Sequence, residues 1–353
     1  MAGDVGVAES ERGLIERIGR RFPKRGAIVG IGDDAAVVAA DGRIVVTSDM
    51  LVEGVDFTAS TPIAFVARKS LAANLSDIAA MGATPAWFTL SLGLPVAWPG
   101  DVDRFFEALE IAAREWQIEL IGGDLSAAPV VTVAITAIGR LPSGQSPLLR
   151  SGAHPGDRVY LSRPIGGAAA GLQLLKSGWS VADDGSVATP AAIGDQAGYA
   201  LREFATAAIR RQVDPWPELR LGALLGQMPG ITSCIDLSDG LSTDLQHICE
   251  ASRCGAVIDR ARIPLFQELP QSAAILGIDA AQAVLHGGEE LALLFTSTLR
   301  ESDLSTRLGQ PVYAIGRMRE GSGVALSVDG VETPLQPLGF DHFSNNGRPA
   351  VPP

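Results

Sequence analysis

Aspartates follow strands or glycine turns at several places in this chain, and together they suggest a site for metal-bound phosphate. Asp33 and Asp34 follow the Gly30-Ile31-Gly32 turn, and Asp77 lies three residues after Asn74, on the same face of a predicted helix. Any single aspartate at a turn most often caps backbone N–H groups. Seven in one chain favour a shared site, because α/β proteins gather ligands at the carboxyl ends of strands. The remaining four stand at strand ends or in the turns that follow: Asp49, Asp124, Asp236 and Asp239.

Electrostatics indicates what such a group of carboxylates would hold. Two like charges about 4 Å apart repel by roughly 4 kcal/mol at an effective dielectric constant of about 20, so converging carboxylates need cations between them. Carboxylates at turns supply the hard oxygen ligands that suit Mg²⁺, which completes its shell with water and substrate phosphates. Positioning and charge neutralisation are also what phosphoryl transfer mainly requires. The sequence therefore predicts an enzyme that binds a polyphosphate through magnesium.

The familiar phosphate-binding motifs are absent from the sequence. There is no G-x-x-x-x-G-K-[ST]; Leu175-Lys176-Ser177 comes nearest but lacks the glycine before the lysine. There is also no G-x-G-x-x-G opening a helix and no protein-kinase catalytic loop. Gly166-Gly167 could offer backbone donors to a phosphate, although a tight strand–helix turn is the simpler reason for this pair.

The composition is that of a globular, acidic protein. Hydrophobic residues make up 46% of the chain, charged residues 19%, and the formal net charge is −12. This charge argues against a nucleic-acid partner, because duplex binding depends on lysines and arginines that contact phosphates. Cys234, Cys249 and Cys254 are too few for a disulfide framework and lack the pairing of a zinc site. We therefore expect reduced thiols in a cytoplasmic protein.

No segment predicts a membrane partner. The first residues carry acids and lack an apolar run, so we expect no signal peptide. Residues 79–100 carry no charge and are long enough to span a bilayer, but three prolines interrupt them. Between Phe88 and Leu94 apolar residues alternate with small or polar ones, which indicates a half-buried strand.

Strands and helices alternate along the chain, which predicts an α/β (α+β) protein of two domains. We place the boundary near residue 150, in a segment at 141–157 that contains Pro, Gly and Ser. Residues 1–150 then form an N-terminal domain, residues 151–343 a C-terminal α/β domain, and residues 344–353 a disordered tail. Helices are predicted at 11–21, 65–81, 102–114, 167–175 and after 240, and strands at 44–46, 88–94, 119–121, 130–138, 158–161 and 231–235.

Several motifs in a fixed order carry a family resemblance. The most specific is Asn74-Leu75-Ser76-Asp77-Ile78-Ala79-Ala80-Met81-Gly82-Ala83, and the next is Asp236-Leu237-Ser238-Asp239-Gly240-Leu241. The others are Gly32-Asp33-Asp34-Ala35-Ala36, Ser48-Asp49 with Glu53-Gly54-Val55, Gly122-Gly123-Asp124, Arg150-Ser151-Gly152-Ala153 and Gly339-Phe340-Asp341-His342-Phe343. In their identity and order, over residues 10–343, they resemble the thiamine-monophosphate kinases, a family of the aminoimidazole-ribonucleotide-synthetase-like superfamily.

This resemblance implies a fold and an activity. The two domains would be like those of aminoimidazole ribonucleotide synthetase, with mixed sheets flanked by helices, and the N-terminal domains would pair in a homodimer. ATP would be the phosphoryl donor, thiamine monophosphate the acceptor and thiamine diphosphate the product, with several Mg²⁺ ions bound. The transfer would be direct, without a side-chain nucleophile, and would be supported by Asp33, Asp77 and Asp236.

The resemblance also assigns roles position by position. Phe106 stands where the family often has a tyrosine beside the nucleotide. Asp34, next to Asp33, and Thr47, next to Ser48, are further candidates for the site. Arg150 matches a position that contacts the nucleotide, and the alternative is that it is a solvated charge in a loop. The metal-binding positions match Asp33, Ser48, Asp49, Asp77, Asp124, Asp236 and Asp239, and the nucleotide-binding positions match Gly123, Asp124, Arg150 and Ser238.

The expected acceptor pocket is where the sequence departs from the family. Asp56 replaces a usual histidine, and Glu289-Glu290 lies in a segment that differs from the usual Gly-Glu-Asp-Tyr-Glu-Leu-Leu. We predict that Asp56, with Glu289 or Glu290, addresses the cationic part of thiamine or a bound magnesium. The alternative is that Asp56 caps a turn before Phe57. Phe340 matches an aromatic position that stacks on the thiamine rings, with a packing role as its alternative.

Two other functions stay open. The chain could be another ATP-dependent enzyme of the superfamily, for example one that activates an amide or formyl oxygen, or a non-catalytic sensor of thiamine phosphates. A sensor has little need of the whole set of metal-binding aspartates. Selenophosphate synthesis would require a reactive cysteine near the N-terminus, and hydrogenase maturation a cysteine at the C-terminus; the sequence has neither.

Overall fold

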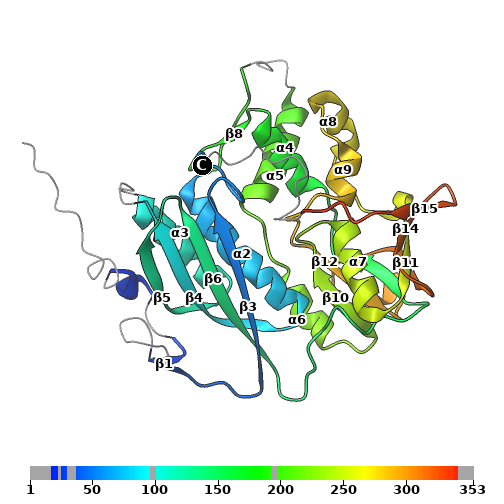
Figure 1. The fold of residues 1–353 in the computed structure, drawn as a ribbon, viewed down its shortest axis with the longest axis horizontal. Helices are drawn as coiled ribbons and strands as arrows, with labels where there is room; N and C mark the ends of the chain where they lie inside the picture. Colours follow the sequence, from blue (N-terminus) through cyan, green and yellow to red (C-terminus); the bar gives the residue numbers. More distant parts are fainter. Residues whose placement is uncertain (1–16, 23–24, 30–36, 96–100, 192–197, 341–353) are drawn as a thin grey trace, which may run out of the picture.

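The computed structural model describes residues 17–22, 25–29, 37–95, 101–191 and 198–340. These ranges form two α/β parts that lie side by side and are linked by residues 142–157 (Figure 1). The predicted domain boundary near residue 150 falls within this link. Asp33, Asp34 and the predicted tail at 344–353 lie outside the described residues.

The N-terminal part is a four-stranded sheet covered by two helices on one face (Figure 1). Neighbouring strands are antiparallel, except that the strands Thr84–Leu94 and Glu119–Ala127 run parallel to each other. On the covered face, Phe88 and Ile135 pack in one core with Leu71, Leu75 and Phe105 of the helices. The strand order is β3 (Arg43–Val52), β6 (Thr132–Leu141), β4 (Thr84–Leu94) and β5 (Glu119–Ala127); the helices are α2 (Ile63–Ala80) and α3 (Asp101–Glu115), and a small β1 (Ala27–Val29)–β2 (Val37–Val38) pair precedes them.

The other face of this sheet is open. Side chains alternate along β3, so that its odd-numbered residues face α2 and its even-numbered residues face outward. Ile44, Val46 and Met50 are therefore 52%, 57% and 57% exposed. Within the described chain, no helix covers this row of apolar side chains.

The Gly122-Gly123-Asp124 segment is not the turn that the sequence suggested. β5 continues through it to Ala127, paired in parallel with β4. A Cβ atom on Gly123 would lie 1.9 Å from the carbonyl oxygen of Leu90. The glycine is therefore needed for the close approach of two strand backbones, which is a different reason from the conformational freedom of a turn.

The C-terminal part is a seven-stranded mixed sheet between two layers of helices. One face packs against α4 (Gly167–Lys176), α5 (Tyr199–Val213), α7 (Leu241–Ser252), α8 (Leu269–Leu276) and α9 (Ala280–Leu285). The other packs against α6 (Leu219–Gly226) and α10 (Glu301–Leu308). The strand order is β10 (Ile231–Asp236), β12 (Leu293–Ser297), β7 (Arg158–Leu161), β13 (Tyr313–Arg319), β11 (Gly255–Asp259), β14 (Val324–Val328) and β15 (Val331–Leu335); β8 (Ser180–Val181), β9 (Val187–Ala188) and η2 (Arg260–Arg262) complete the elements.

Helix α2 joins the two parts. Ala79 and Ala80 at its carboxyl end share a core with Leu221 and Leu225 of α6 and with Phe295 of the C-terminal sheet. A Cβ atom on Gly222 would lie 2.1 Å from the carbonyl oxygen of Ala79, so only glycine permits this crossing. The same helix thus carries Asp77 and fixes the position of the C-terminal part.

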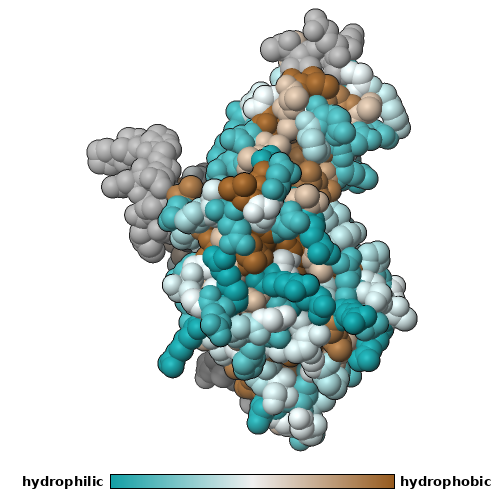
Figure 2. Space-filling view, turned by 90° about the vertical axis from the view of Figure 1, so that its right-hand side faces the viewer, coloured by the Kyte–Doolittle hydropathy of each residue, from teal (hydrophilic) through white to brown (hydrophobic). Residues whose placement is uncertain are grey.

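The surface on the C-terminal side is mainly hydrophilic, with several hydrophobic patches in its upper half and middle (Figure 2). Ile275 of α8 is 71% exposed, the highest value for a large aliphatic side chain in the described part of the chain. No helix in the described part of the chain combines the length and apolar character needed to cross a membrane.

Candidate active site

Four of the predicted aspartates converge between the two parts of the molecule. Asp49 comes from β3, Asp77 from α2, Asp236 from the end of β10 and Asp239 from the turn after it. Burial raises the pKa of Asp49 to about 6, and the negative charges of Asp77 and Asp239 add to the rise. Such mutual influence requires the carboxylates to lie close together. The site therefore combines the interior of β3, which continues to Val52 beyond Asp49, and helix α2 with the carboxyl end of β10.

The N-terminal half of the site is fixed by hydrogen bonds between β3 and α2. Thr47 Oγ1 donates to Asp77 Oδ2 at 2.5 Å, and the backbone N–H of Asp49 donates to Asn74 Oδ1 at 3.0 Å. Asn74 itself is fully buried and its Nδ2 donates to the Ser70 carbonyl at 3.0 Å. The Asn74–Asp77 spacing places both side chains on the face of α2 that meets β3.

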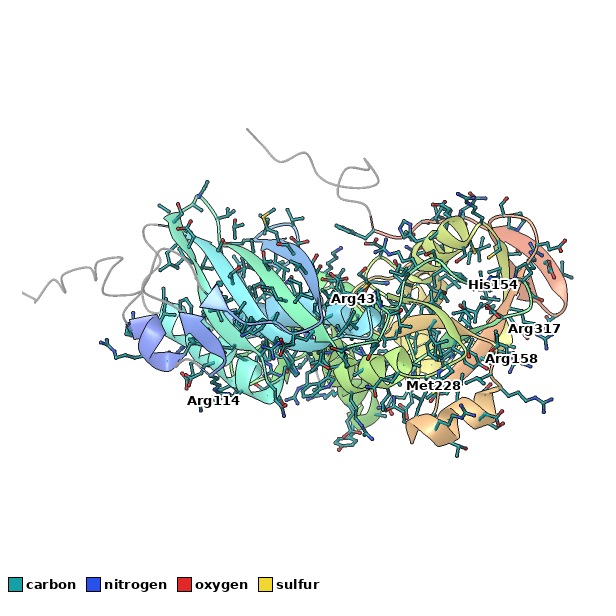
Figure 3. The ribbon with its side chains drawn as sticks, turned by 90° about the horizontal axis from the view of Figure 1, so that it is seen from below. Arg43, Arg114, His154, Arg158, Met228 and Arg317 are labelled. Atoms are coloured by element: carbon teal, nitrogen blue, oxygen red, sulfur yellow. The ribbon has the colours of Figure 1, made fainter. Side chains whose placement is uncertain are left out.

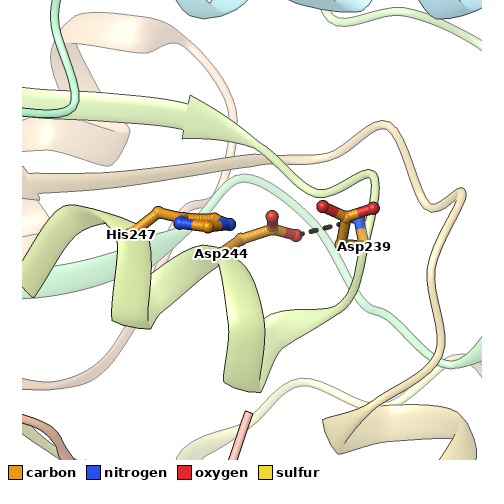
Figure 4. Close-up of side chains that lie close together, drawn as sticks. All are labelled: Asp239, Asp244 and His247. Carbon is orange, nitrogen blue, oxygen red and sulfur yellow. Dashed lines mark hydrogen bonds between the residues drawn. The ribbon is translucent and has the colours of Figure 1, made fainter. Parts of the chain in front are cut away.

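The C-terminal half is the turn between β10 and α7, which is held on several sides. The Leu237 N–H donates to the Ala292 carbonyl at 2.8 Å, and the Ser238 carbonyl accepts from the Glu289 N–H at 2.8 Å. Asp244, in the first turn of α7, accepts from the N–H groups of Asp239 at 3.2 Å and Gly240 at 3.0 Å (Figure 4). The turn is therefore rigidly positioned before any ligand arrives.

Asp236 lies deepest in the site. It is 3% exposed, and burial raises its pKa to about 7, with the negative charges of Asp77 and Asp49 acting in the same direction. The positive charge of Arg150 opposes this rise, as it does for Asp77. Arg150 is exposed in the middle of the interdomain link, and its carbonyl accepts from Ser252 Oγ at 3.1 Å. The predicted nucleotide-binding arginine therefore lies beside the aspartates.

A second group of possible metal ligands adjoins the first. One ligand atom from each of Asp239, Asp244 and His247 lies within 4.8 Å of the others (Figure 4). Burial, followed by the charges of Asp236 and Asp239, raises the pKa of Asp244 well above its usual range. Asp244 Oδ2 accepts from two backbone N–H groups, so the main role of this carboxylate is to stabilise the turn.

Ser48 and Asp124 do not join the cluster through their side chains. Ser48 is even-numbered on β3, so its hydroxyl lies on the open face, within 3.1 Å of the Ile135 carbonyl and of Thr136 Oγ1. Asp124 pairs with Ser91, in the same sheet row as Ala134 and Met50, and this row also faces outward. The sheet itself separates both side chains from Asp49 and Asp77.

Phe106 was expected beside the nucleotide, and that expectation is wrong for its side chain. It is 2% exposed in the N-terminal core and meets Phe105 edge-on, with ring centroids 5.4 Å apart. Its spacing from Leu109 and Ala113 on α3 places it on the buried face of this amphipathic helix. A ring buried in this way has no free face to offer a nucleotide base.

The two consecutive glutamates of the expected acceptor pocket have different surroundings. Glu289 is partly exposed and pairs with Lys69 Nζ at 2.5 Å, while Gln212 Nε2 also donates to it. Glu290 is 1% exposed, and its Oε1 accepts from the N–H groups of Gly166 and Ala168, both at 2.8 Å. An acceptor contact by Glu290 conflicts with this geometry. The N–H donors of Gly166 and Ala168, in the turn that contains the Gly166-Gly167 pair, thus bind a buried carboxylate and not a phosphate.

Asp56 caps the turn that follows β3. Its Oδ2 accepts from the Val52 N–H at 2.8 Å, while the Asp56 N–H donates to the Val52 carbonyl at 2.9 Å. This is the alternative that the sequence left open. Phe340 is 45% exposed, and its N–H donates to the Asp239 carbonyl at 3.1 Å, so it lies next to the acidic site.

Three further residues hold neighbouring segments of the chain together, although their sequence context carried little signal of this. Lys69 is 6% exposed and joins α2 to Glu289 of the C-terminal part. Glu119 is 8% exposed and accepts from the N–H groups of Arg25 and Gly26, at 2.8 and 2.6 Å. Asp244 forms the turn described above. For Glu119, the available sequence signal is a single charge within the apolar run at 118–121.

Comparison with known proteins agrees with this architecture. Residues 32–141 match the family described as AIR synthase related protein, N-terminal domain, and residues 154–329 match AIR synthase related protein, C-terminal domain. The thiamine-monophosphate kinase of Escherichia coli (strain K12) is 36% identical over 326 residues, covering 90% of this chain and 92% of that protein. The chain belongs to the thiamine-monophosphate kinase family. The member from Bacillus subtilis (strain 168) is 33% identical and covers 89% of this chain and 93% of its own.

Solved structures of thiamine-monophosphate kinases share the fold. The crystal structure of the enzyme from Stenotrophomonas maltophilia K279a is 35% identical with a TM-score of 0.75, covering 90% of this chain and 96% of that one. The structure described as AaThiL complexed with AMPPCP and TMP has a TM-score of 0.72 at 27% identity, covering 97% and 100%. The hydrogenase maturation protein HypE of E. coli, at 17% identity, shares the fold alone. The predicted two-domain α/β fold is thus confirmed.

Proposed function

We propose that this chain phosphorylates thiamine monophosphate with ATP and produces thiamine diphosphate. The observation that carries the proposal is the convergence of Asp49, Asp77 and Asp236 from two domains into one buried acidic site. The choice of substrates follows from the relatives, which are named thiamine-monophosphate kinases. One related structure is described as a complex with AMPPCP and TMP.

Magnesium fits the donor set of this site. Burial and mutual repulsion raise the pKa values of Asp49 and Asp236 to about 6 and about 7, which shows how unfavourable the ionised cluster is without a cation. Carboxylate oxygens are ligands that Mg²⁺ prefers. We assign Asp49, Asp77, Asp236 and Asp239 as its ligands, with Asp33 as a further candidate outside the described residues. Bound magnesium would neutralise phosphate charge and orient the phosphates for transfer.

The residues of the chain position both substrates. Arg150 lies beside the aspartates and is suited to bind phosphate oxygens through its guanidinium group. Ser238, in the turn after β10, is exposed toward solvent and remains a candidate nucleotide contact. The attacking group is a phosphate oxygen of the acceptor, which is anionic at neutral pH. The transfer therefore needs neither a side-chain nucleophile nor a strong base.

The acceptor contacts are Asp56, Glu289 and Phe340 in this proposal. Asp56 lies in the turn after β3, where its Oδ2 accepts from the Val52 N–H, and Phe340 is exposed beside Asp239. Carboxylates attract the cationic thiazolium ring, and an exposed aromatic ring stacks on it. Glu290 is left out, because its carboxylate is buried against α4.

We also infer a homodimer built from the open faces of the N-terminal sheets. The exposed row on β3 is mainly apolar, with Ile44, Val46 and Met50 interrupted only by Ser48, as expected of a buried interface core. Asp124 lies on the same face, so its proposed metal contact requires a site that includes the partner subunit. The three cysteines are free and buried, which supports a reducing compartment such as the cytoplasm.

A product assay tests the proposed activity. The protein is incubated with ATP and thiamine monophosphate at a series of magnesium concentrations, and thiamine diphosphate is measured by chromatography. We expect product only when magnesium and both substrates are present, with stoichiometric ADP. Release of ADP without thiamine diphosphate would point to a different acceptor and would overturn the assignment.

A further inference from the structure

A second charged cavity lies on the C-terminal sheet, away from the aspartates. It has a volume of about 320 Å³ and is formed over strands β7, β13, β11, β14 and β15, next to the start of α10. Its charged wall residues are Arg158, Arg262, Arg317, Asp259, Glu301 and Glu332. None of them belongs to the acidic site, which lies at the opposite, β10 edge of this sheet.

Two arginines face each other in this cavity. Arg158 of β7 and Arg317 of β13 are direct partners in the antiparallel register, so their side chains leave the sheet on the same face (Figure 3). Like charges placed opposite each other on neighbouring strands destabilise a sheet unless something compensates them. The arrangement therefore requires an explanation from its surroundings.

The side chain of Arg317 has no compensating partner among the described residues. It is exposed, and it forms no hydrogen bond or ion pair with any of them. Arg158 makes only long contacts, from Nη1 to the carbonyls of Thr298 and Leu299, both at 3.4 Å. A carbonyl oxygen supplies only a partial negative charge, and neither arginine has a carboxylate within ion-pair distance among the described residues.

The carboxylates of the wall are engaged elsewhere. Asp259 Oδ1 accepts from the Ala261 N–H at 3.0 Å, and Glu332 Oε2 accepts from Arg319 at 2.6 Å. Glu301 Oε2 accepts from the Ala314 N–H at 3.3 Å and pairs with Arg262 at 3.5 Å. Each carboxylate thus has a structural partner, and none forms an ion pair with Arg158 or Arg317 within the described chain.

We propose that this cavity is a binding site for a small oxyanion held between Arg158 and Arg317. Guanidinium groups present a planar fork of donors that matches phosphate and carboxylate oxygens. The volume suits a small molecule and is at the lower end for ligand pockets. The three carboxylates that line the same cavity disfavour a large polyanion, so the ligand class is a small metabolite with one phosphoryl or carboxylate end.

Binding of simple anions tests the proposal. Inorganic phosphate and succinate are titrated separately into the full chain by calorimetry, with EDTA and without nucleotide, so that the two arms distinguish a phosphoryl from a carboxylate ligand. We expect at least one to bind in the millimolar range or tighter. Arg317→Gln and Arg158→Gln should each weaken this binding about tenfold to hundredfold, because each removes charge-assisted hydrogen bonds.

Matched controls separate this site from others. Arg307→Gln makes the same change in charge on an exposed position of α10 outside the cavity, and it should leave the affinity unchanged. Asp77→Asn alters the acidic site and should also leave it unchanged. Thermal melting should show that the Arg317→Gln protein is folded and at least as stable as the parent. Equal affinity in all variants, loss of binding only in Asp77→Asn, or no binding of either anion to the parent would each overturn the proposal.

Discussion

The hydroxyl of Thr47 donates a 2.5 Å hydrogen bond to Asp77 and so ties strand β3 to helix α2 inside the acidic site. Burial raises the pKa of Asp77, while this bond and the charge of Arg150 oppose the rise. The bond therefore favours the ionised carboxylate that a cation requires. Thr47 is a positioning residue, because its hydroxyl acts through Asp77.

Substitution of Thr47 and Asp77 tests this relationship. Thr47→Val keeps the shape but removes the donor, and hydrogen bonds to charged groups contribute about 1.5–3 kcal/mol. We expect kcat/KM to fall about tenfold to hundredfold, with a higher magnesium concentration needed for half-maximal rate. Thr47→Ser, which retains the hydroxyl, should recover most of the activity. Asp77→Asn should abolish turnover while the protein melts normally; near-normal turnover in this variant would contradict the assigned site.

The buried carboxyls make stability depend on pH and magnesium. Burial, with neighbouring negative charge, raises the pKa of Asp49 to about 6 and that of Asp236 to about 7. A carboxyl titrates near 4 when unfolded, so between about pH 4 and pH 7 the folded state binds more protons than the unfolded state. The free energy of unfolding of the metal-free protein therefore falls as pH rises through this window.

Scanning calorimetry with and without magnesium checks this expectation. Magnesium competes with protons for the same oxygens, so it should raise Tm by several degrees more at about pH 8 than at about pH 5. Asp236→Asn removes one of the titrating groups and should flatten the pH dependence of the metal-free protein. A magnesium effect of equal size at both pH values would show that the carboxylates do not bind the ion.

Local patterns predicted much of the fold. The alternation at residues 88–94 predicted the core of β4, and the apolar spacing of Leu71, Leu75 and Ile78 predicted α2. β4 begins four residues earlier than predicted, because strand pairing extends it beyond the alternating pattern, and α2 begins two residues earlier and ends one residue earlier than predicted. The motifs around Asp77 and Asp236 pointed to these two aspartates, which the structure brings together with Asp49 and Asp239.

What the sequence could not show depends on register and burial. Side chains alternate along β3, so the register that turns Asp49 toward α2 turns Ser48 toward the open face. The face on which Asp124 lies is known only from the strand pairing that connects β5 through β4 and β6 to β3. Phe106 was predictable as a core residue from its helical spacing. Glu290 was not, because the donors that hold its carboxylate come from Gly166 and Ala168, far away in the sequence.

Asp56 combines a structural contact with a predicted electrostatic one, and two substitutions separate them. Asp56→Asn keeps an oxygen that can accept from the Val52 N–H and removes only the charge. We expect it to raise the KM for thiamine monophosphate about threefold to tenfold and to leave the KM for ATP nearly unchanged. Asp56→Ala also loses the cap, so it should lower the free energy of unfolding by about 1 kcal/mol.

Steady-state kinetics and thermal melting together decide between the two roles of Asp56. Asp56→His, which introduces the residue usual in the family, should retain activity. If Asp56→Asn leaves the acceptor KM untouched while Asp56→Ala lowers stability, the side chain serves the turn alone. Charge then has no part in acceptor binding at this position.

The proposed dimer rests on the open face of the N-terminal sheet, and a charge placed there should break it. Val46 is 57% exposed in the middle of the row formed with Ile44 and Met50. In a two-fold dimer the Val46→Glu substitution occurs twice across one interface, and an unpaired buried carboxylate costs several kcal/mol. Light scattering should therefore report a dimer for the parent chain and a folded monomer for Val46→Glu.

Ile111→Glu provides the matched control, because Ile111 is 54% exposed on α3, on the other side of the sheet. It should remain dimeric. Asp124 shares the open face with Met50, so loss of the dimer should also remove any contribution of Asp124 to the partner's site. The Val46→Glu monomer is then expected to need more magnesium for activity than the Ile111→Glu dimer. A monomeric parent chain, or a dimer that survives Val46→Glu, would exclude this face as the interface.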